Sequence, residues 1–219
     1  RQAFFRRLNL APGATQGIVA TRRDLLEIGE GDPVLALVDG DLKHLFHSWF
    51  NRGFLVLRRI DWQTPAAILE KIIAYEAVHA IESWDDLRRR LDPKDRRCFA
   101  FFHPSLIDEP LIFVEVALTH EISDAVQPLL TAPPKDEAIE APTTAVFYSI
   151  SNCQDGLKGI SFGHFLIKQV VEDLVRELPT LKTFVTLSPV PGFAQWLAGA
   201  DGRAVVASLS EEERNAAGL

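Results

Sequence analysis

The sequence of 219 residues contains no methionine and only two cysteines, Cys98 and Cys153. Two cysteines this far apart have neither a metal-ligand spacing nor the pairing of a disulfide framework, which argues against a structural zinc site and favours a reducing compartment, the cytoplasm. Because methionine is missing even at position 1, the chain does not begin at an ordinary translation start. We interpret it as part of a longer protein, truncated at both ends.

Long apolar runs are also missing. No stretch approaches the roughly 18 residues of a membrane span, and the start of the chain is too short in apolar character for a secretory signal. Basic residues are outnumbered, 23 against 30 acidic residues, and the net charge of -7 argues against nucleic-acid binding. An anionic ligand remains possible, since backbone N–H groups at a helix start can hold phosphate. With 47% hydrophobic residues, the chain can build one large globular domain or two small ones.

The first third has the apolar spacing of helices. Residues 21–30 and 41–59 are predicted to be helical, Thr64 and Pro65 resemble a helix start, and Ser83 resembles an N-cap with Asp86 three residues on. Strands are predicted where Phe, Val and Ile are dense. The predicted strands cover residues 98–103, 111–118, 144–151 and 182–188.

Three further helices are expected, over residues 121–130, 165–178 and 208–219, and residues 131–142, which contain three prolines, are expected to form an exposed loop. The sequence therefore predicts an α+β fold, with a helical N-terminal region followed by a mixed β-sheet flanked by helices. The expected domains are 1–79, a helical domain, and 80–219.

Three glycines are concentrated between the strand over 144–151 and the helix over 165–178, at Gly156, Gly159 and Gly163. Glycine permits tight turns and close approach of a ligand to the backbone, and the following helix offers unpaired N–H groups. This combination is typical of a pyrophosphate-binding loop. The alternative is an ordinary strand-to-helix loop that needs glycine only for its turns.

Ser188 follows the last predicted strand and precedes Pro189 and Pro191, so its hydroxyl is held on a stiff backbone. Ligands usually bind beyond the carboxyl ends of strands in an open sheet, which makes Ser188 a candidate catalytic residue. The alternative is that Ser188 caps a short helix near residues 193–197 or ends a strand.

Longer motifs extend beyond these two segments. They are Arg7–Ala14, Ser48–Leu55, Phe147–Gly159 with Gly163 and Phe165–Lys168, and Leu187–Phe193. Together they closely resemble the malonyl-CoA decarboxylase family over nearly the whole chain. The resemblance implies a helical N-terminal, oligomerisation domain and a catalytic domain with the GNAT acetyltransferase fold.

The resemblance also implies the site and the reaction. The loop that binds malonyl-CoA would consist of Lys158, Gly159, Ile160, Ser161, Phe162, Gly163 and His164, and Ser188 would be the catalytic serine. The expected activity is a carboxy-lyase of fatty acid metabolism that converts malonyl-CoA to acetyl-CoA and CO2 as a homo-oligomer. No cofactor is expected beyond the coenzyme A of the substrate, and no metal, nucleic acid or membrane. Lys158 and Lys168 are candidate phosphate partners.

The family's catalytic histidine belongs to an Asn-Pro-Val-Ala-Asn-Phe-His pattern that does not occur among residues 1–219. The histidines present do not match it, namely His44, His47, His79, His103, His120 and His164. The 219 residues alone are therefore expected to be inactive. Two other functions stay open: a GNAT-type acyl-CoA-dependent N-acyltransferase, which could use the same loop, and a noncatalytic helical scaffold.

Overall fold

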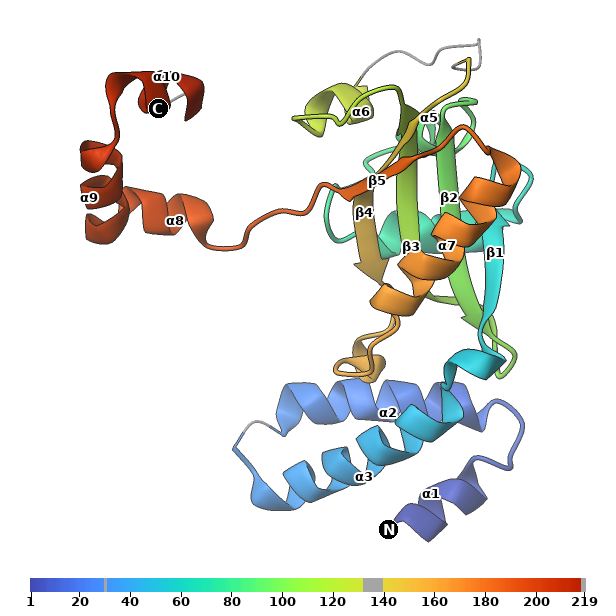
Figure 1. The fold of residues 1–219 in the computed structure, drawn as a ribbon. Helices are drawn as coiled ribbons and strands as arrows, with labels where there is room; N and C mark the ends of the chain where they lie inside the picture. The colour runs from blue at the N-terminus through green and yellow to red at the C-terminus, as the bar shows by residue number, and fades with distance from the viewer. Residues whose placement is uncertain (30, 132–139, 218–219) are drawn as a thin grey trace. The chain divides into compact units, whose positions relative to one another are not determined.

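The structure is a computed structural model, and it describes all residues except 30, 132–139 and 218–219. The chain forms two compact units, Arg1–Leu187 and Ser188–Leu219, which are described separately. The first unit begins with three helices and continues as a five-stranded sheet flanked by further helices (Figure 1). The predicted fold class, a helical region followed by a mixed sheet, is confirmed. The proposed domain border at residues 79 and 80 stays a prediction.

The helical region contains α1 (Gln2–Leu8), α2 (Ala14–Ile28) and α3 (Pro33–Trp49). Helix α3 begins at Pro33 because the carboxylate of Asp32 accepts hydrogen bonds from the N–H groups of Val34 and Leu35. The prediction of a helix over residues 21–30 is confirmed for residues 21–28, since α2 ends at Ile28 with Gly29 as its C-cap, and residue 30 lies outside the described residues.

The prediction of one helix over residues 41–59 is wrong beyond Trp49. Asn51 accepts a hydrogen bond from the N–H of Gly53 and starts the short 3-10 helix η1 (Arg52–Phe54), after which the chain becomes strand β1 (Val56–Ile60). The helical spacing of apolar residues in this segment is overridden because β1 pairs along its whole length with the next strand.

The sheet has the strand order β1-β2-β3-β4-β5, with antiparallel pairs from β1 to β4 and a parallel pair between β4 and β5. The remaining strands are β2 (Arg96–His103), β3 (Leu106–Thr119), β4 (Thr144–Asn152) and β5 (Thr183–Thr186). The flanking helices are α4 (Ala66–Tyr75), α5 (Trp84–Leu91), α6 (Gln127–Thr131) and α7 (Gly163–Glu177). Since β4 and β5 are parallel, α7 serves as the crossover between them.

Each face of the sheet is covered by a different set of helices. On one face, Leu166, Val170 and Leu174 of α7 pack in one core with Phe99, Phe101 and other buried strand residues. On the other face, buried residues of α4 and α5 pack on Cys98, Ala100, Phe102 and Phe113. The strand residues alternate between the two cores, as expected for a sheet that is buried on both faces.

One predicted helix start agrees with the structure, and several other predicted boundaries differ from it. Ser83 caps α5 through a 3.1 Å bond from the N–H of Asp86, as predicted. Thr64 does not cap α4, because its hydroxyl instead accepts the N–H of Asp61 in the preceding turn. Strand β3 begins at Leu106 rather than at residue 111, and β5 is shorter than the predicted strand over 182–188.

The helix predicted over residues 121–130 is wrong before α6, which covers only Gln127–Thr131. Of the loop predicted over 131–142, residues 132–139 lie outside the described residues. The second unit contains three helices among the residues that the structure describes, which are α8 (Phe193–Ala198), α9 (Ala200–Ser208) and α10 (Glu211–Ala217). The predicted helix over 208–219 corresponds to α10, which starts later because Ser210 accepts the N–H of Glu213.

A buried polar cluster lies on the face that α4 and α5 cover. Glu115 of β3 has an exposed fraction of 0% and accepts a 3.2 Å hydrogen bond from Arg90 of α5. Beside it, the carboxylate of Glu76 accepts bonds from the hydroxyls of Ser149 (2.8 Å) and Ser151 (3.2 Å). Burial raises the pKa of Glu115 to about 8, although Arg90 acts in the opposite direction.

We expect the Glu115→Gln variant to lose part of the pH dependence of folding. The pKa of Glu115 lies above its ordinary value of 4.5 in the folded protein, at about 8, so its contribution to stability is present at low pH and lost as the pH rises between these values. The unfolding temperature of the unaltered protein should therefore fall more steeply from pH 5 to pH 8 than that of the variant.

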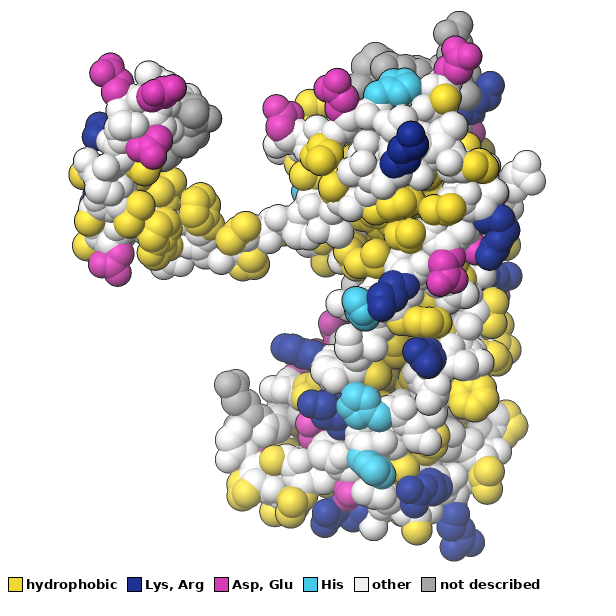
Figure 2. Space-filling model, in the orientation of Figure 1, with side chains coloured by type: hydrophobic (Ala, Val, Ile, Leu, Met, Phe, Trp, Pro, Cys, Tyr) yellow, Lys and Arg dark blue, Asp and Glu magenta, His cyan; other side chains and the backbone are white. Residues whose placement is uncertain are grey.

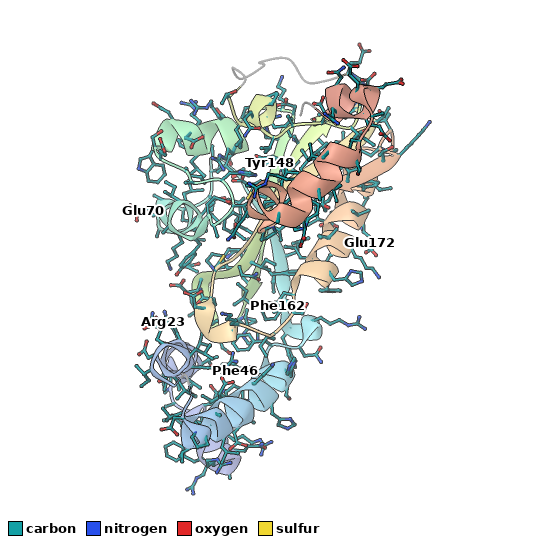
Figure 3. All side chains as sticks on the ribbon, turned by 90° about the vertical axis from the view of Figure 1, so that its left-hand side faces the viewer. Arg23, Phe46, Glu70, Tyr148, Phe162 and Glu172 are labelled. Carbon is teal, nitrogen blue, oxygen red and sulfur yellow. The ribbon has the colours of Figure 1, made fainter. Side chains whose placement is uncertain are left out.

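The matched control is Glu172→Gln, which removes an exposed carboxylate on the outer side of α7 (Figure 3). This control should keep the pH dependence of the unaltered protein. Equal slopes for Glu115→Gln and the unaltered protein would contradict the prediction.

Candidate functional site

The glycine-rich segment connects the end of β4 to the start of α7 and lies against helix α2 (Figure 1). It begins with the 3-10 helix η2 (Asp155–Leu157) and continues through Lys158 to Phe162. Gly159 has a φ of +82°, a conformation that favours glycine because a side chain there would be strained. The predicted loop between a strand and a helix is therefore present, with its turn at Gly159.

Gly156 is required for a different reason, its contact with the helical region. A Cβ atom at Gly156 would overlap with the carbonyl oxygen of Val19 on α2. The absence of a side chain therefore lets the backbone of η2 pack directly on the backbone of α2.

The side chain of Arg22, on α2, donates hydrogen bonds to this segment. Its Nη1 donates to the carbonyl oxygens of Gly156 at 2.7 Å and of Lys158 at 2.9 Å. Its Nε donates to Asp39 of α3 at 2.7 Å, and its guanidinium lies 5.9 Å from the ring centroid of Phe46. Sequence reasoning missed this residue.

The loop presents a series of backbone N–H groups without an acceptor. Within the described part of the chain, no backbone or side-chain hydrogen bond uses the N–H groups of Gly159, Ser161, Phe162, Gly163, His164 and Phe165. Three of these belong to the first turn of α7, where the helix dipole is positive. The segment therefore has the chemical character of an anion-binding site.

Basic side chains lie beside these N–H groups. The amino end of Lys43 of α3 lies against Gly159, since a Cβ placed there would be 3.2 Å from both Cε and Nζ. The guanidinium of Arg52 lies 5.7 Å from the ring centroid of Phe165. Neither cation forms an ion pair with a residue that the structure describes. Figure 2 shows Lys, Arg and His side chains over the helical region and the N-terminal end of α7.

A pocket of about 300 Å³ adjoins the loop. Its lining comes from the ends of β3 and β4 and from the loop itself, and consists of Leu111, Asn152, Gln154, Asp155, Leu157, Lys158, Gly159, Ile160 and Phe162. The predicted binding residues thus differ in what they can offer. Lys158, Ser161 and His164 are exposed, whereas Ile160 and Phe162 are buried in the core and can contribute only backbone groups to a ligand.

Strand β4 has a partly unpaired edge next to this pocket. Its register with β5 covers only Thr144–Phe147, and among the described residues the rest of β4 pairs with β3 alone. Tyr148, where the unpaired part begins, is also the extra residue of a bulge against β3, between the Glu115–Ser149 and Val116–Phe147 pairs. Beyond Tyr148, whose carbonyl oxygen lies 3.1 Å from Nε2 of His79, this edge has no strand partner among the described residues and is open to an extended ligand.

Ser188 opens the second unit, one residue after Leu187, whose N–H donates to the carbonyl of Phe147 at 2.9 Å. It is exposed and precedes Pro189. Ser188 does not cap the following helix, because α8 has Gly192 as its N-cap and no side-chain capping bond among the described residues. The capping alternative is therefore wrong, and β5 ends at Thr186, two residues before Ser188. The catalytic role of Ser188 and its proximity to the loop stay predictions.

A metal-binding cluster and a membrane-spanning helix are both absent from the part of the chain that the structure describes. No group of three or more His, Cys, Asp or Glu residues there could hold a metal ion. None of the described helices is long and apolar enough to cross a membrane.

The first unit thus defines a class of α+β protein in which a mixed sheet presents a strand, a glycine-rich loop and a helix with free N–H groups. Two family models match the chain. Malonyl-CoA decarboxylase N-terminal domain matches residues 1–50 and Malonyl-CoA decarboxylase C-terminal domain matches residues 53–218. The chain belongs to the malonyl-CoA decarboxylase family.

Individual relatives agree with this family. Mitochondrial malonyl-CoA decarboxylase of Anser anser anser is 42% identical over 204 residues, which are 90% of this chain and 40% of that protein. The crystal structure of malonyl-CoA decarboxylase from Agrobacterium vitis is 62% identical with a TM-score of 0.87, over 98% of this chain and 52% of that one. The structure from Rhodopseudomonas palustris is 61% identical with a TM-score of 0.83, over 96% and 50%. The chain therefore spans about half the length of these relatives.

Proposed function

We propose that the protein of which this chain is part converts malonyl-CoA to acetyl-CoA and CO2. The observation that carries the proposal is the series of free N–H groups from Gly159 into the first turn of α7, in a chain of the malonyl-CoA decarboxylase family. These groups suit the diphosphate of coenzyme A. The unpaired edge of β4 suits the extended pantetheine arm, which carries amide groups.

The substrate contains its own electron sink, which is why no cofactor is proposed. When the bond between the carboxylate carbon and Cα of the malonyl group breaks, CO2 leaves and the electron pair moves into the thioester carbonyl as an enolate. A proton then adds to Cα and gives acetyl-CoA. The protein must anchor coenzyme A, stabilise the enolate oxygen with preorganised donors and deliver the proton.

Each of these tasks has a proposed residue. The loop from Lys158 to His164 anchors the diphosphate, with Lys43 and Arg52 adding positive charge beside it and Lys168 as a further candidate. The hydroxyl of Ser188 donates a hydrogen bond or relays a proton at the malonyl group. The family resemblance assigns the proton donor to a histidine in a segment that has no counterpart among residues 1–219.

The main alternative is an acyl-CoA-dependent N-acyltransferase, and one assay separates the two reactions. Full-length protein incubated with malonyl-CoA alone should release CO2 and form acetyl-CoA in equal amounts, and EDTA should not reduce the rate. A transferase would give neither product alone and would release free CoA only after an amine is added. Absence of CO2 release from an intact, CoA-binding protein would overturn the proposal.

We expect Lys43→Gln to weaken CoA binding without unfolding the protein. A solvent-exposed charge pair contributes up to about 1 kcal/mol, so the dissociation constant should rise about fivefold, and less at high salt. The control is Lys182→Gln, which removes an exposed lysine beyond the opposite end of α7. Isothermal titration of both variants with CoA tests the prediction, and equal affinities would contradict it.

The assembly and the compartment stay predictions. We propose a homo-oligomer formed through the helical region, which exposes several large apolar side chains, namely Phe4, Leu8, Leu10, Ile28, Val34 and Leu37. Light scattering on the full-length protein tests this. We also propose a cytoplasmic location, as expected from the free cysteines, although the Anser anser anser and Mus musculus relatives are named mitochondrial.

A further inference from the structure

We infer that Arg22 is a positioning residue for the diphosphate of coenzyme A, so that a side chain of α2 controls substrate affinity without touching the substrate. The inference rests on the proposed function. It concerns a residue that lies 134 positions before the first loop carbonyl it binds.

The guanidinium of Arg22 is a buried charge. Arg22 has an exposed fraction of 2% and forms an ion pair with Asp39, whose side chain is 29% exposed. A buried guanidinium is costly unless its N–H groups are bonded. Two loop carbonyls accept bonds from Nη1 at 2.7 and 2.9 Å, so the loop conformation and the burial of Arg22 depend on each other.

The bond from Arg22 to the carbonyl of Lys158 fixes the orientation of the peptide group between Lys158 and Gly159. A trans peptide points its C=O and N–H in opposite directions. The carbonyl of Lys158 faces Arg22 on the α2 side, so the N–H of Gly159 in the same peptide faces away from α2. Gly159, at a φ of +82°, then redirects the chain toward the start of α7. Arg22 thereby sets the orientation of the first free N–H in the series.

Helices α2 and α3 hold Arg22 and the loop in fixed positions. Gly156 packs on the backbone of Val19, one turn before Arg22 on the same helix. Asp39 holds the guanidinium from α3. The carbonyls of Gly156 and Lys158 are therefore held in place by Arg22, which two helices support. The free N–H groups of the loop are then already oriented before a ligand binds. This preorganisation lowers the entropic cost of binding.

Arg22→Lys is the decisive variant, because lysine keeps the charge but cannot bind Asp39 and two carbonyls in the same planar geometry. In the full-length protein we expect the dissociation constant for CoA to rise at least about tenfold, as for the loss of charge-assisted hydrogen bonds. The value of kcat/KM for malonyl-CoA should fall by a similar factor, through KM rather than kcat.

S-Malonyl-pantetheine, which lacks the diphosphate, separates positioning from general stability. Its kcat/KM should be the same for Arg22→Lys and the unaltered protein, because the oriented amides have no phosphate to bind. The control is Arg23→Lys, which changes the adjacent, half-exposed arginine that pairs with Asp24. Figure 3 shows Arg23 on the same helix. This control should behave as the unaltered protein with both substrates.

The outcomes are distinguishable. If the unaltered protein neither binds CoA nor releases CO2, the proposed function fails. If it does both and Arg22→Lys binds CoA normally, or loses both substrates equally, the inference alone is overturned. Should Arg22→Lys fail to fold, Asp39→Asn removes the carboxylate that fixes the guanidinium, and with it the position from which Nη1 donates to both loop carbonyls. Its CoA affinity should then fall with activity on S-malonyl-pantetheine intact, and unchanged CoA affinity would overturn the inference.

Discussion

Ser188→Ala in the full-length protein is expected to keep its affinity for CoA and lose most of its decarboxylation. Removing one preorganised donor from a developing oxyanion commonly lowers turnover about 10²-fold or more. The effect should fall on kcat, because the hydroxyl interacts with charge that forms only in the transition state. Steady-state CO2 release and a CoA titration measure the two quantities separately.

Ser208→Ala is the matched control for this variant. Ser208 belongs to the same unit, ends α9 and donates its hydroxyl to the carbonyl of Val205 at 2.6 Å. Its loss should leave turnover unchanged. Near-normal turnover of Ser188→Ala would remove this residue from the proposed mechanism.

Gly156→Ala should disrupt both the fold of the loop and the binding of CoA. The new methyl group would overlap with backbone of Val19, and neither backbone segment can move without separating η2 from α2. Overpacking of this kind costs about 1–3 kcal/mol of unfolding free energy. The displaced carbonyl of Gly156 would also lose its bond to Arg22, so CoA affinity should fall together with stability.

Gly17→Ala provides the control on the same helix. Nothing lies within 4 Å of a Cβ at Gly17, which occupies the interior of α2. Alanine there should raise the unfolding free energy by about 0.5–1 kcal/mol, because glycine is a poor helix former. Chemical denaturation of both variants tests the pair, and equal destabilisation would show that the overlap at Gly156 is unimportant.

Sequence reasoning located the loop because glycine, a strand before it and a helix after it are all local features. It did not separate the roles of the loop residues. Ile160 and Phe162 look like neighbours of a ligand in the sequence, but both side chains are part of the core beneath α7. Whether a loop side chain faces a ligand or packs in the core depends on how the loop lies on the core, which the local sequence does not show.

Arg22 and β1 were missed for reasons of range. Arg22 lies three residues after Val19 and four after Ile18, so helical spacing places it on the buried side of α2, but no local pattern shows that it binds a loop carbonyl 134 residues later. Residues 56–60 follow a helical spacing, yet pairing with β2 makes them a strand. In both cases the deciding partner is distant in the sequence, and local propensity carries no information about it.

The two cysteines, Cys98 and Cys153, are both buried. Burial raises the pKa of the thiols of Cys98 and Cys153, which suppresses the thiolate form in both. Disulfides of coenzyme A exchange with accessible thiolates. The thiols of Cys98 and Cys153 should therefore resist S-thiolation by disulfides of coenzyme A.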